Sequence, residues 1–476
     1  MTQTEKGKSL KEILQEFYQK NQFVRFDTFF VNYMLCREVR NPSIEQRKEA
    51  FHLFRDKTGK KNFASFSTMQ KWFGLGGYTE PRRSQIFEFA FSLSLSTEGV
   101  NQFFQCGLCA PAIQVNDYQE TIFWYGLENN YTYEKCLELI QYFERHMALD
   151  VEIVHTSQTG DLLHQFQLKK KLSEKQFMEW MVANAGAFKG YSQTTLNYLI
   201  KYKKVVLKQA RQEQKDVLET TLSYTDYEVW KMKNRFRFKS ESEGEKIRQY
   251  IYNNRKMPEE QRKEILNMVS FVYFEEDSNV RLISEIFGKK NLLGGHFSFH
   301  HIMTEKYLSD LLNVAVHKER EIRTAQAECV LKTMDEEPNT LCPQWIVTQM
   351  RECLGITCQD YITVKEALQS LSTYRKEHRR RLIQIERADL LPFVQYVVLQ
   401  RYMESIQYQQ EEYDFREARK QFVELADQTL SACNMARFSE EYELDALLLV
   451  SFQENECYLY GEMLEEMVKM KELSLK

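Results

Sequence analysis

Apolar residues recur at spacings of three and four along most of the chain, which is the period of an α-helix. The first clear example is the segment 9–36, where two apolar stripes are separated near Asn21–Gln22. The stripes comprise Leu10, Ile13, Leu14 and Phe17, followed by Phe26, Phe29, Phe30, Tyr33 and Met34. The alternation of apolar and polar residues that is typical of a strand is not sustained over any long segment. The pattern therefore predicts an all-α protein.

Capping residues and glycines predict where the next helices begin and end. Ser43 precedes a helix expected up to about residue 56, and Gln46 stands at the position that completes a capping box. After a basic loop, a short helix is expected over residues 65–73, ended by the glycines of 74–77. Pro81 then lies near the first turn of the following helix, where its missing N–H is tolerated.

A two-helix pattern occurs twice, 36 residues apart, in residues 83–104 and 119–140. The matching positions are Ile86 and Ile122, Phe87 and Phe123, Phe89 and Tyr125, Ala90 and Gly126, Ser96 and Thr132, and Glu98 and Glu134. A fixed period of this length is typical of stacked helical hairpins, each of which buries its apolar face against its neighbour. We therefore expect a two-copy helical-hairpin repeat over residues 83–145.

Polar, turn-forming segments suggest how the chain is divided. The clearest runs from Phe238 to Gly244, and weaker ones occur at residues 288–295 and 335–343. They predict four regions: an N-terminal region, the repeat that shares a helix with it, a helical middle domain and a helical C-terminal region. Their expected bounds are 1–110, 83–145, 146–240 and 241–476, the last divided near 335–343.

Composition agrees with helices and locates the charge. With 17 Gly and 7 Pro in 476 residues, turn-forming residues are scarce. The net charge is −4, but residues 1–90 hold 16 Lys and Arg against 10 Asp and Glu, whereas residues 91–160 hold 2 against 9. The basic N-terminal segment either contacts phosphate groups or is an ordinary mixed surface.

Cysteine usage and hydropathy give an expected location. The ten cysteines are scattered, and the single Cys-x-x-Cys pair, Cys106 and Cys109, lacks a second pair that would complete a tetrahedral metal site. Neither a signal-peptide pattern nor a run of ~18 apolar residues is found. We expect a cytoplasmic protein with free thiols and no membrane partner.

Other patterns give little evidence of catalysis. His296 and His300 have the spacing of a helical metal pair, but Phe297 stands where a zinc peptidase motif has glutamate. The glycines of 74–77 lack the Lys-Ser/Thr of a phosphate-binding loop. The basic run Arg375–Arg381 is either a solvated helix surface or a nucleic-acid contact. We predict no catalytic residue, metal or cofactor, and therefore no enzyme.

The segment 65–83 carries the pattern of a DNA-reading helix. A recognition helix needs polar side chains that reach base edges and apolar side chains one turn apart that anchor it. Met69, Trp72 and Phe73 suit the second requirement. The candidate DNA-binding residues are Ser67, Thr68, Gln70 and Lys71, with Arg82 and Arg83 placed to reach flanking phosphates.

This segment resembles the second half of Cro/C1-type (XRE-like) helix-turn-helix regulators of Gram-positive bacteria. In that family a recognition helix is followed by a glycine-containing loop and a proline-arginine turn. Here Gly74–Gly77 and Pro81–Arg83 have these positions, and Phe89–Ser96 resembles the end of the next helix. The resemblance covers about residues 26–145. It implies a DNA-binding transcriptional regulator whose helical body senses a peptide, a small molecule or a protein.

The segment before the recognition helix departs from the family pattern. Residues 37–64 form a longer, charged insertion, with Pro42 and Gly59, where the positioning helix and its turn should lie. Two interpretations therefore stay open. One is the DNA-binding regulator, and the other is a non-catalytic helical scaffold or adaptor, from a mobile element or defence locus, with a vestigial helix-turn-helix.

Overall fold

The regular structure of this chain is helical throughout the part that the computed structural model describes. The described residues are 8–21, 23–147, 154, 159–254, 256–275, 279–288, 303–334, 339–377, 384–408, 413–454 and 457–474. Among them the only β-structure is two isolated bridges, Leu341 with Thr363 and Phe452 with Cys457. The predicted all-α class is confirmed.

The N-terminal unit is built around aromatic side chains. Its helices are α2 (Phe26–Leu35), α3 (Ile44–Lys57), α4 (Phe66–Lys71), α5 (Arg83–Ser92) and α6 (Thr97–Gln102). The capping box at Ser43 forms as predicted, with Ser43 N donating to Gln46 Oε1 at 2.7 Å. The Phe30 ring lies at the centre, 4.3 Å from the Phe73 ring and 5.4 Å from the Phe89 ring. This cluster fixes α4 and α5 against α2.

The two copies of the sequence repeat form two stacked hairpins. The first comprises α5 and α6, continued by the π-helical turn Phe103–Gly107, and the second comprises α7 (Tyr118–Glu128) and α8 (Tyr133–His146). The matched residues Ser96 and Thr132 each cap the second helix of their copy. The hairpins pack through another matched pair, because the rings of Phe87 and Phe123 stack 4.8 Å apart. Residues at matching positions of the sequence repeat therefore have equivalent roles in the two hairpins.

The remaining helices surround a long helix, α11 (Gln193–Ser223). Before it lie α9 (Thr159–Lys169) and α10 (Glu174–Ala183), whose apolar residues join the N-terminal core. A second core unites the first half of α11 with α1 (Leu10–Lys20), α15 (Asn279–Phe287), α16 (Glu305–Leu312), α20 (Arg387–Gln407), α21 (Phe415–Ala432), α22 (Glu443–Val450) and α23 (Tyr460–Ser474). A third core joins α17 (Val314–Met334), α18 (Gln344–Glu352) and α19 (Val364–Glu377).

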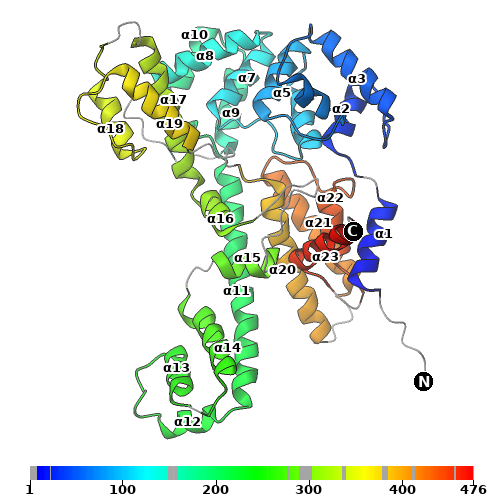
Figure 1. The fold of residues 1–476 in the computed structure, drawn as a ribbon, viewed down its shortest axis with the longest axis vertical. Helices are drawn as coiled ribbons and strands as arrows, with labels where there is room; N and C mark the ends of the chain where they lie inside the picture. The colour runs from blue at the N-terminus through cyan, green and yellow to red at the C-terminus, as the bar shows by residue number, and fades with distance from the viewer. Residues whose placement is uncertain are drawn as a thin grey trace.

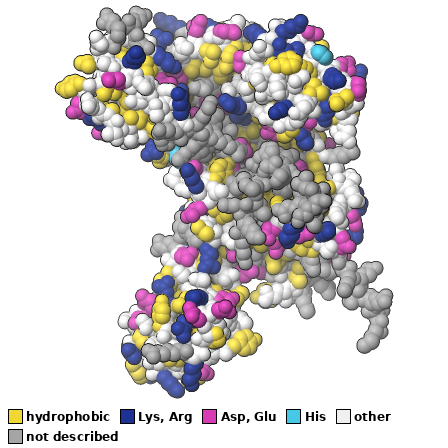
Figure 2. Space-filling view, in the orientation of Figure 1, with side chains coloured by type: hydrophobic (Ala, Val, Ile, Leu, Met, Phe, Trp, Pro, Cys, Tyr) yellow, Lys and Arg dark blue, Asp and Glu magenta, His cyan; other side chains and the backbone are white. Residues whose placement is uncertain are grey.

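The second half of α11 carries a separate arm. It consists of that half together with α12 (Tyr227–Lys233), α13 (Glu243–Asn253) and α14 (Glu259–Val269), which share the fourth core. Figure 1 shows α11 running down from the body to this arm, which stands apart from the other helices. The same lobe projects at the lower left of the space-filling view in Figure 2.

The cores do not follow the expected domain bounds in two places. The arm core includes Tyr227 and Tyr250, on either side of the boundary expected at 240. Helix α1 packs through Leu14 and Phe17 into the core of α20–α23, although residues 1–110 were expected to form one region. The polar segment at 238–244 is therefore a connection within the arm core, because apolar side chains on both sides of it are buried together. Residues 23–25, in contrast, connect helices that belong to two different cores.

One further property of the helices concerns membranes. Within the described part of the chain, no helix combines the length and the apolar character needed to cross a bilayer.

Candidate functional site

Helix α4 carries four of the six predicted DNA-binding residues. Its N-cap is Ser65, whose Oγ accepts from Thr68 N at 3.2 Å. Met69, Trp72 and Phe73 are fully buried, as the pattern predicted, so the opposite face of the helix is directed outward. The four polar residues are Ser67, which is exposed, and Thr68, Gln70 and Lys71, which are half-buried.

The connection between α3 and α4 is longer than the turn of a compact helix-turn-helix motif. Residues 58–65 lie between α3 and α4, whereas the turn of that motif typically has about 3–4 residues. Arg55 closes this longer loop by donating to Lys60 O at 2.7 Å and to Asn62 Oδ1 at 3.1 Å. The loop is therefore an ordered part of the unit.

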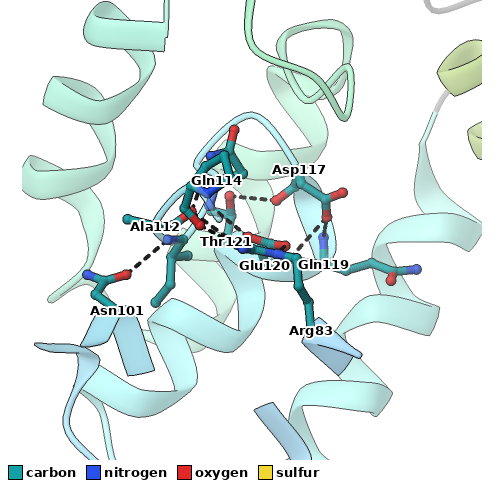
Figure 3. Close-up of polar contacts among 10 residues, drawn as sticks. Arg83, Asn101, Ala112, Gln114, Asp117, Gln119, Glu120 and Thr121 are labelled. Atoms are coloured by element: carbon teal, nitrogen blue, oxygen red, sulfur yellow. Dashed lines mark hydrogen bonds and ion pairs between the residues drawn. The ribbon is translucent and has the colours of Figure 1, made fainter. Parts of the chain in front are cut away.

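The structure separates the two flanking arginines. Arg82 is exposed to solvent, whereas the side chain of Arg83 is only 12% exposed and points into the protein. Arg83 Nε lies 2.7 Å from Glu120 Oε1, and its Nη2 lies 2.7 Å from Glu120 Oε2 (Figure 3). Its Nη1 also donates to Pro111 O at 2.6 Å. The guanidinium group is thus committed to internal contacts, and we exclude Arg83 from the candidate DNA surface.

The Arg83–Glu120 pair joins the two copies of the repeat. Arg83 is the first residue of α5, and Glu120 lies in the first turn of α7. The fork-to-fork geometry is the strong, oriented form of an arginine–carboxylate contact. The guanidinium group also lies 3.7 Å from the centre of the Phe104 ring. These contacts fix the start of α5 relative to the start of α7.

The segment before α7 is held by its own side chains. Asp117 caps the helix, because its Oδ1 accepts from Gln119 N at 2.9 Å and from Glu120 N at 3.1 Å. Gln114 N donates to Glu120 Oε2 at 2.7 Å, so Glu120 ties this segment to Arg83 (Figure 3). An aspartate directly before the apolar run of 118–126 is a helix-cap signal that is present in the sequence.

A cavity of about 170 Å³ lies beside this network. Its walls come from α5, α7, the start of α11, α17 and residues 384–385, so it borders helices that belong to several cores. Its aromatic lining includes Phe87, Tyr118, Phe123 and Tyr191. Ligand pockets for drug-sized molecules are roughly 300–1,000 Å³, so this cavity suits a smaller polar molecule and is too small for a folded partner or a long peptide.

The charges that line the cavity are mostly paired. Lys318 Nζ lies 3.0 Å from Glu321 Oε2, and burial would lower the pKa of Lys318, but attraction to Glu321 and Asp117 raises it instead. Asp117 forms no ion pair within 4 Å among the described residues. Burial, followed by the charge of Glu120, raises the pKa of Asp117 to about 6. Asp117 is therefore the lining carboxylate best placed to receive a proton donor from a ligand.

The other sequence candidates contribute no site in the described residues. Arg375 Nη1 lies 3.0 Å from Glu328 Oε2, while residues 378–381 of the basic run lie outside the described residues. His296 and His300 also lie outside them. Among the residues that are described, no group of three or more His, Cys, Asp or Glu is arranged to hold a metal ion. Burial raises the pKa of the Cys109 thiol to about 12, which keeps it protonated.

Comparisons of this chain with models of protein families, with curated proteins and with solved structures found no match. The resemblance to XRE-like regulators therefore stays a prediction.

Proposed function

We propose that this protein is a DNA-binding regulator of transcription whose helical body senses a small polar molecule. The observation that carries the proposal is the placement of two adjacent arginines. Arg82 is exposed immediately before α5, and Arg83, the first residue of α5, lines the cavity. One helix start, that of α5, therefore takes part in both candidate sites.

The proposed DNA surface consists of Ser67, Thr68, Gln70, Lys71 and Arg82. Hydroxyl and amide side chains such as the first three donate to and accept from base edges in the major groove. Lysine and arginine contact phosphates, which position the protein on the duplex. The buried face of α4 supports this role, because a helix anchored in an aromatic core presents its polar face in a fixed orientation.

The proposed link between the sites is the Arg83–Glu120 pair. A ligand that fills the cavity contacts the start of α5 and α7, where this pair and the Asp117 cap lie. A ligand shifts a conformational equilibrium only if it binds two states with different affinity. A polar molecule that competes for the Arg83 contacts would bind the two states with different affinity, because those contacts depend on how α5 is placed relative to α7. Asp117 would hold such a molecule at the start of α7.

The DNA-binding part is tested by fluorescence anisotropy with duplex DNA from upstream of the protein's own gene. The test variant is Lys71→Ala with Arg82→Ala. The matched control is Lys175→Ala with Lys420→Ala, which removes two exposed charges from α10 and α21. Loss of two phosphate contacts lowers the slope of log K against log salt by about two. The control variant should keep the slope of the unmodified protein.

Two further variants address sequence reading and sensing. Ser67→Ala with Gln70→Ala should reduce the preference for the upstream DNA over an unrelated duplex. Native mass spectrometry of the purified protein should show a retained small molecule, which Ala325→Phe should exclude because Ala325 lines the cavity. If no duplex is bound, or if the charge variant and its control behave alike, the regulator proposal is rejected in favour of the scaffold interpretation.

A further inference from the structure

The end of the arm presents an unusual run of cations. Residues 229–240 contain five Lys or Arg and no Asp or Glu. The members are Lys231, Lys233, Arg235, Arg237 and Lys239. Among the described residues only Lys231 forms ion pairs: its Nζ lies 2.6 Å from Glu243 Oε1 and 4.0 Å from Glu228 Oε1. The other four side chains belong to exposed residues.

This cationic segment lies far from the rest of the protein. Helix α11, which carries the arm, has 31 residues and is therefore about 46 Å long. Figure 1 places α12 and the turn after it at the lower end of the molecule, and Figure 2 shows dark blue side chains at that tip. A partner could therefore reach the tip without touching the N-terminal unit.

An aromatic ring is exposed among the cations. Phe236 lies between Arg235 and Arg237 and is 79% exposed, and Met232 is 66% exposed. The guanidinium group of Arg235 lies 4.4 Å from the centre of the Phe236 ring. A single exposed apolar side chain is common on protein surfaces, and Tyr361 is 80% exposed in this chain. What distinguishes Phe236 is its position among exposed cations.

The exposed ring is held outward by buried neighbours. Phe238 is only 7% exposed, and its ring stacks on Trp230 at 5.3 Å. Trp230 packs in turn against Tyr250 at 5.7 Å. Asn234 Nδ2 donates to Trp230 O at 2.9 Å, and Phe238 N donates to Asn234 O at 3.2 Å. The chain is therefore fixed on both sides of Phe236, which leaves that ring facing solvent.

We propose that the tip of the arm binds a nucleic-acid strand with unpaired bases. The four exposed cations supply contacts to successive phosphates, and Phe236 supplies a face on which one base stacks. Binding of single strands typically combines these two elements, a basic track and exposed aromatic side chains. A duplex has its base faces covered, so it would use the cations and leave the ring without a partner.

Charge complementarity favours this partner over the other surfaces that an exposed ring could meet. An apolar protein surface would leave the four cations desolvated and unpaired, which is costly. Guanidinium groups match phosphate oxygens in pairs, and they also stack on base planes. The proposal goes beyond duplex recognition by α4, because it concerns another ligand and a separate part of the chain.

The full-length protein is titrated into labelled 20-nucleotide single strands of mixed sequence, one of DNA and one of RNA, and into a 20-base-pair duplex. The test variants are Phe236→Ala and Arg235→Ala with Arg237→Ala. The matched controls are Tyr361→Ala, which removes an aromatic side chain that is 80% exposed, and Lys175→Ala with Lys420→Ala. Polyglutamate and vesicles of phosphatidylglycerol and phosphatidylcholine complete the set of probes.

Phe236→Ala is expected to weaken binding of at least one single strand by about five- to 150-fold, the range for one stacked base, and to leave duplex binding unchanged. The double arginine variant should also lower the salt slope by about two. Loss of DNA binding alone, RNA binding alone or both supports the proposal and identifies the strand.

The proposal is overturned if neither strand binds, or if polyglutamate competes as well as either strand. It is also overturned if Phe236→Ala weakens binding of the vesicles but not of either strand. The two proposals can fail separately. Lys71→Ala with Arg82→Ala affects the upstream duplex and leaves strand binding at the tip intact, whereas Phe236→Ala has the reverse effect.

Discussion

The Arg83–Glu120 pair is the contact whose loss should most strongly loosen the repeat. The replacement Arg83→Met keeps much of the length and apolar stem of the side chain and removes the guanidinium group. Glu120, whose side chain is 13% exposed, then loses both bonds to Arg83 and keeps the one from Gln114 N. Pro111 O also loses its donor, and Ala112 O loses one of two donors and keeps Gln114 Nε2 at 3.2 Å.

The expected cost can be estimated from these contacts. Breaking a buried ion pair by removing one partner destabilises by about 3–5 kcal/mol. Because Glu120 keeps one bond and a little solvent, we expect the lower end, about 3 kcal/mol. The double variant Arg83→Met with Glu120→Leu should recover part of this loss, since it removes the uncompensated charge.

Amide hydrogen exchange followed by mass spectrometry is the suitable assay. The described chain contains four cores, and hydrogen exchange reports on the helices of each core separately, whereas a denaturation midpoint reports on the chain as a whole. A loss of about 3 kcal/mol lowers the protection of amides in α5 and α7 by about 100-fold, because 1.36 kcal/mol is a factor of ten. Amides of the arm core should keep their protection.

The exposed pair of Lys175 and Glu179 is the control. Their charged atoms lie 4.0 Å apart and their side chains are 87% and 59% exposed, so Glu179→Gln should cost less than about 0.5 kcal/mol. If Arg83→Met lowers protection of α5 and α7 by less than about fivefold, the pair does not fix the two hairpins. The proposed route from the cavity to Arg82 would then lose its basis.

Two other predictions concern stability. Because burial and then Glu120 raise the pKa of Asp117 to about 6, above its ordinary value of about 3.9, its ionisation costs stability as the pH rises from about 4 to 6. Asp117→Asn can still cap α7, so its stability relative to the unmodified protein should grow over this range and level off by about pH 7; a flat difference in urea midpoints from pH 4 to 8 would contradict this. Gly126→Ala would overlap Cys136 Sγ and should cost about 1–3 kcal/mol, whereas Gly160→Ala meets open space and should stabilise by about 0.5 kcal/mol; melting temperatures shifted in the same direction would refute the argument.

Local patterns in the sequence were enough to predict the class and many of the helices. Apolar spacing predicted α2, and the cap residue Ser43 predicted the start of α3. The repeat predicted two equivalent hairpins, with Ser96 and Thr132 at matching caps. These features depend on residues within one or two turns of each other, so they can be inferred without knowledge of distant contacts.

The direction of individual side chains could not be inferred in this way. Arg82 and Arg83 are adjacent and chemically alike, and both were predicted to reach phosphate. Their environments differ because Pro111 O and Glu120 approach only the second of them. Those partners come from 28 and 37 positions further along the chain, so only the packing of the two hairpins decides which arginine is buried.

The arm follows the same rule. Sequence alone determined that residues 229–240 are cationic and aromatic. Only the tertiary structure decided that this segment lies at the end of a long arm, that Phe238 is buried and that Phe236 is exposed. The physical reason is that the burial of Phe238 depends on Trp230, which packs in turn against Tyr250. Tyr250 reaches Trp230 only because α13 folds back against α12.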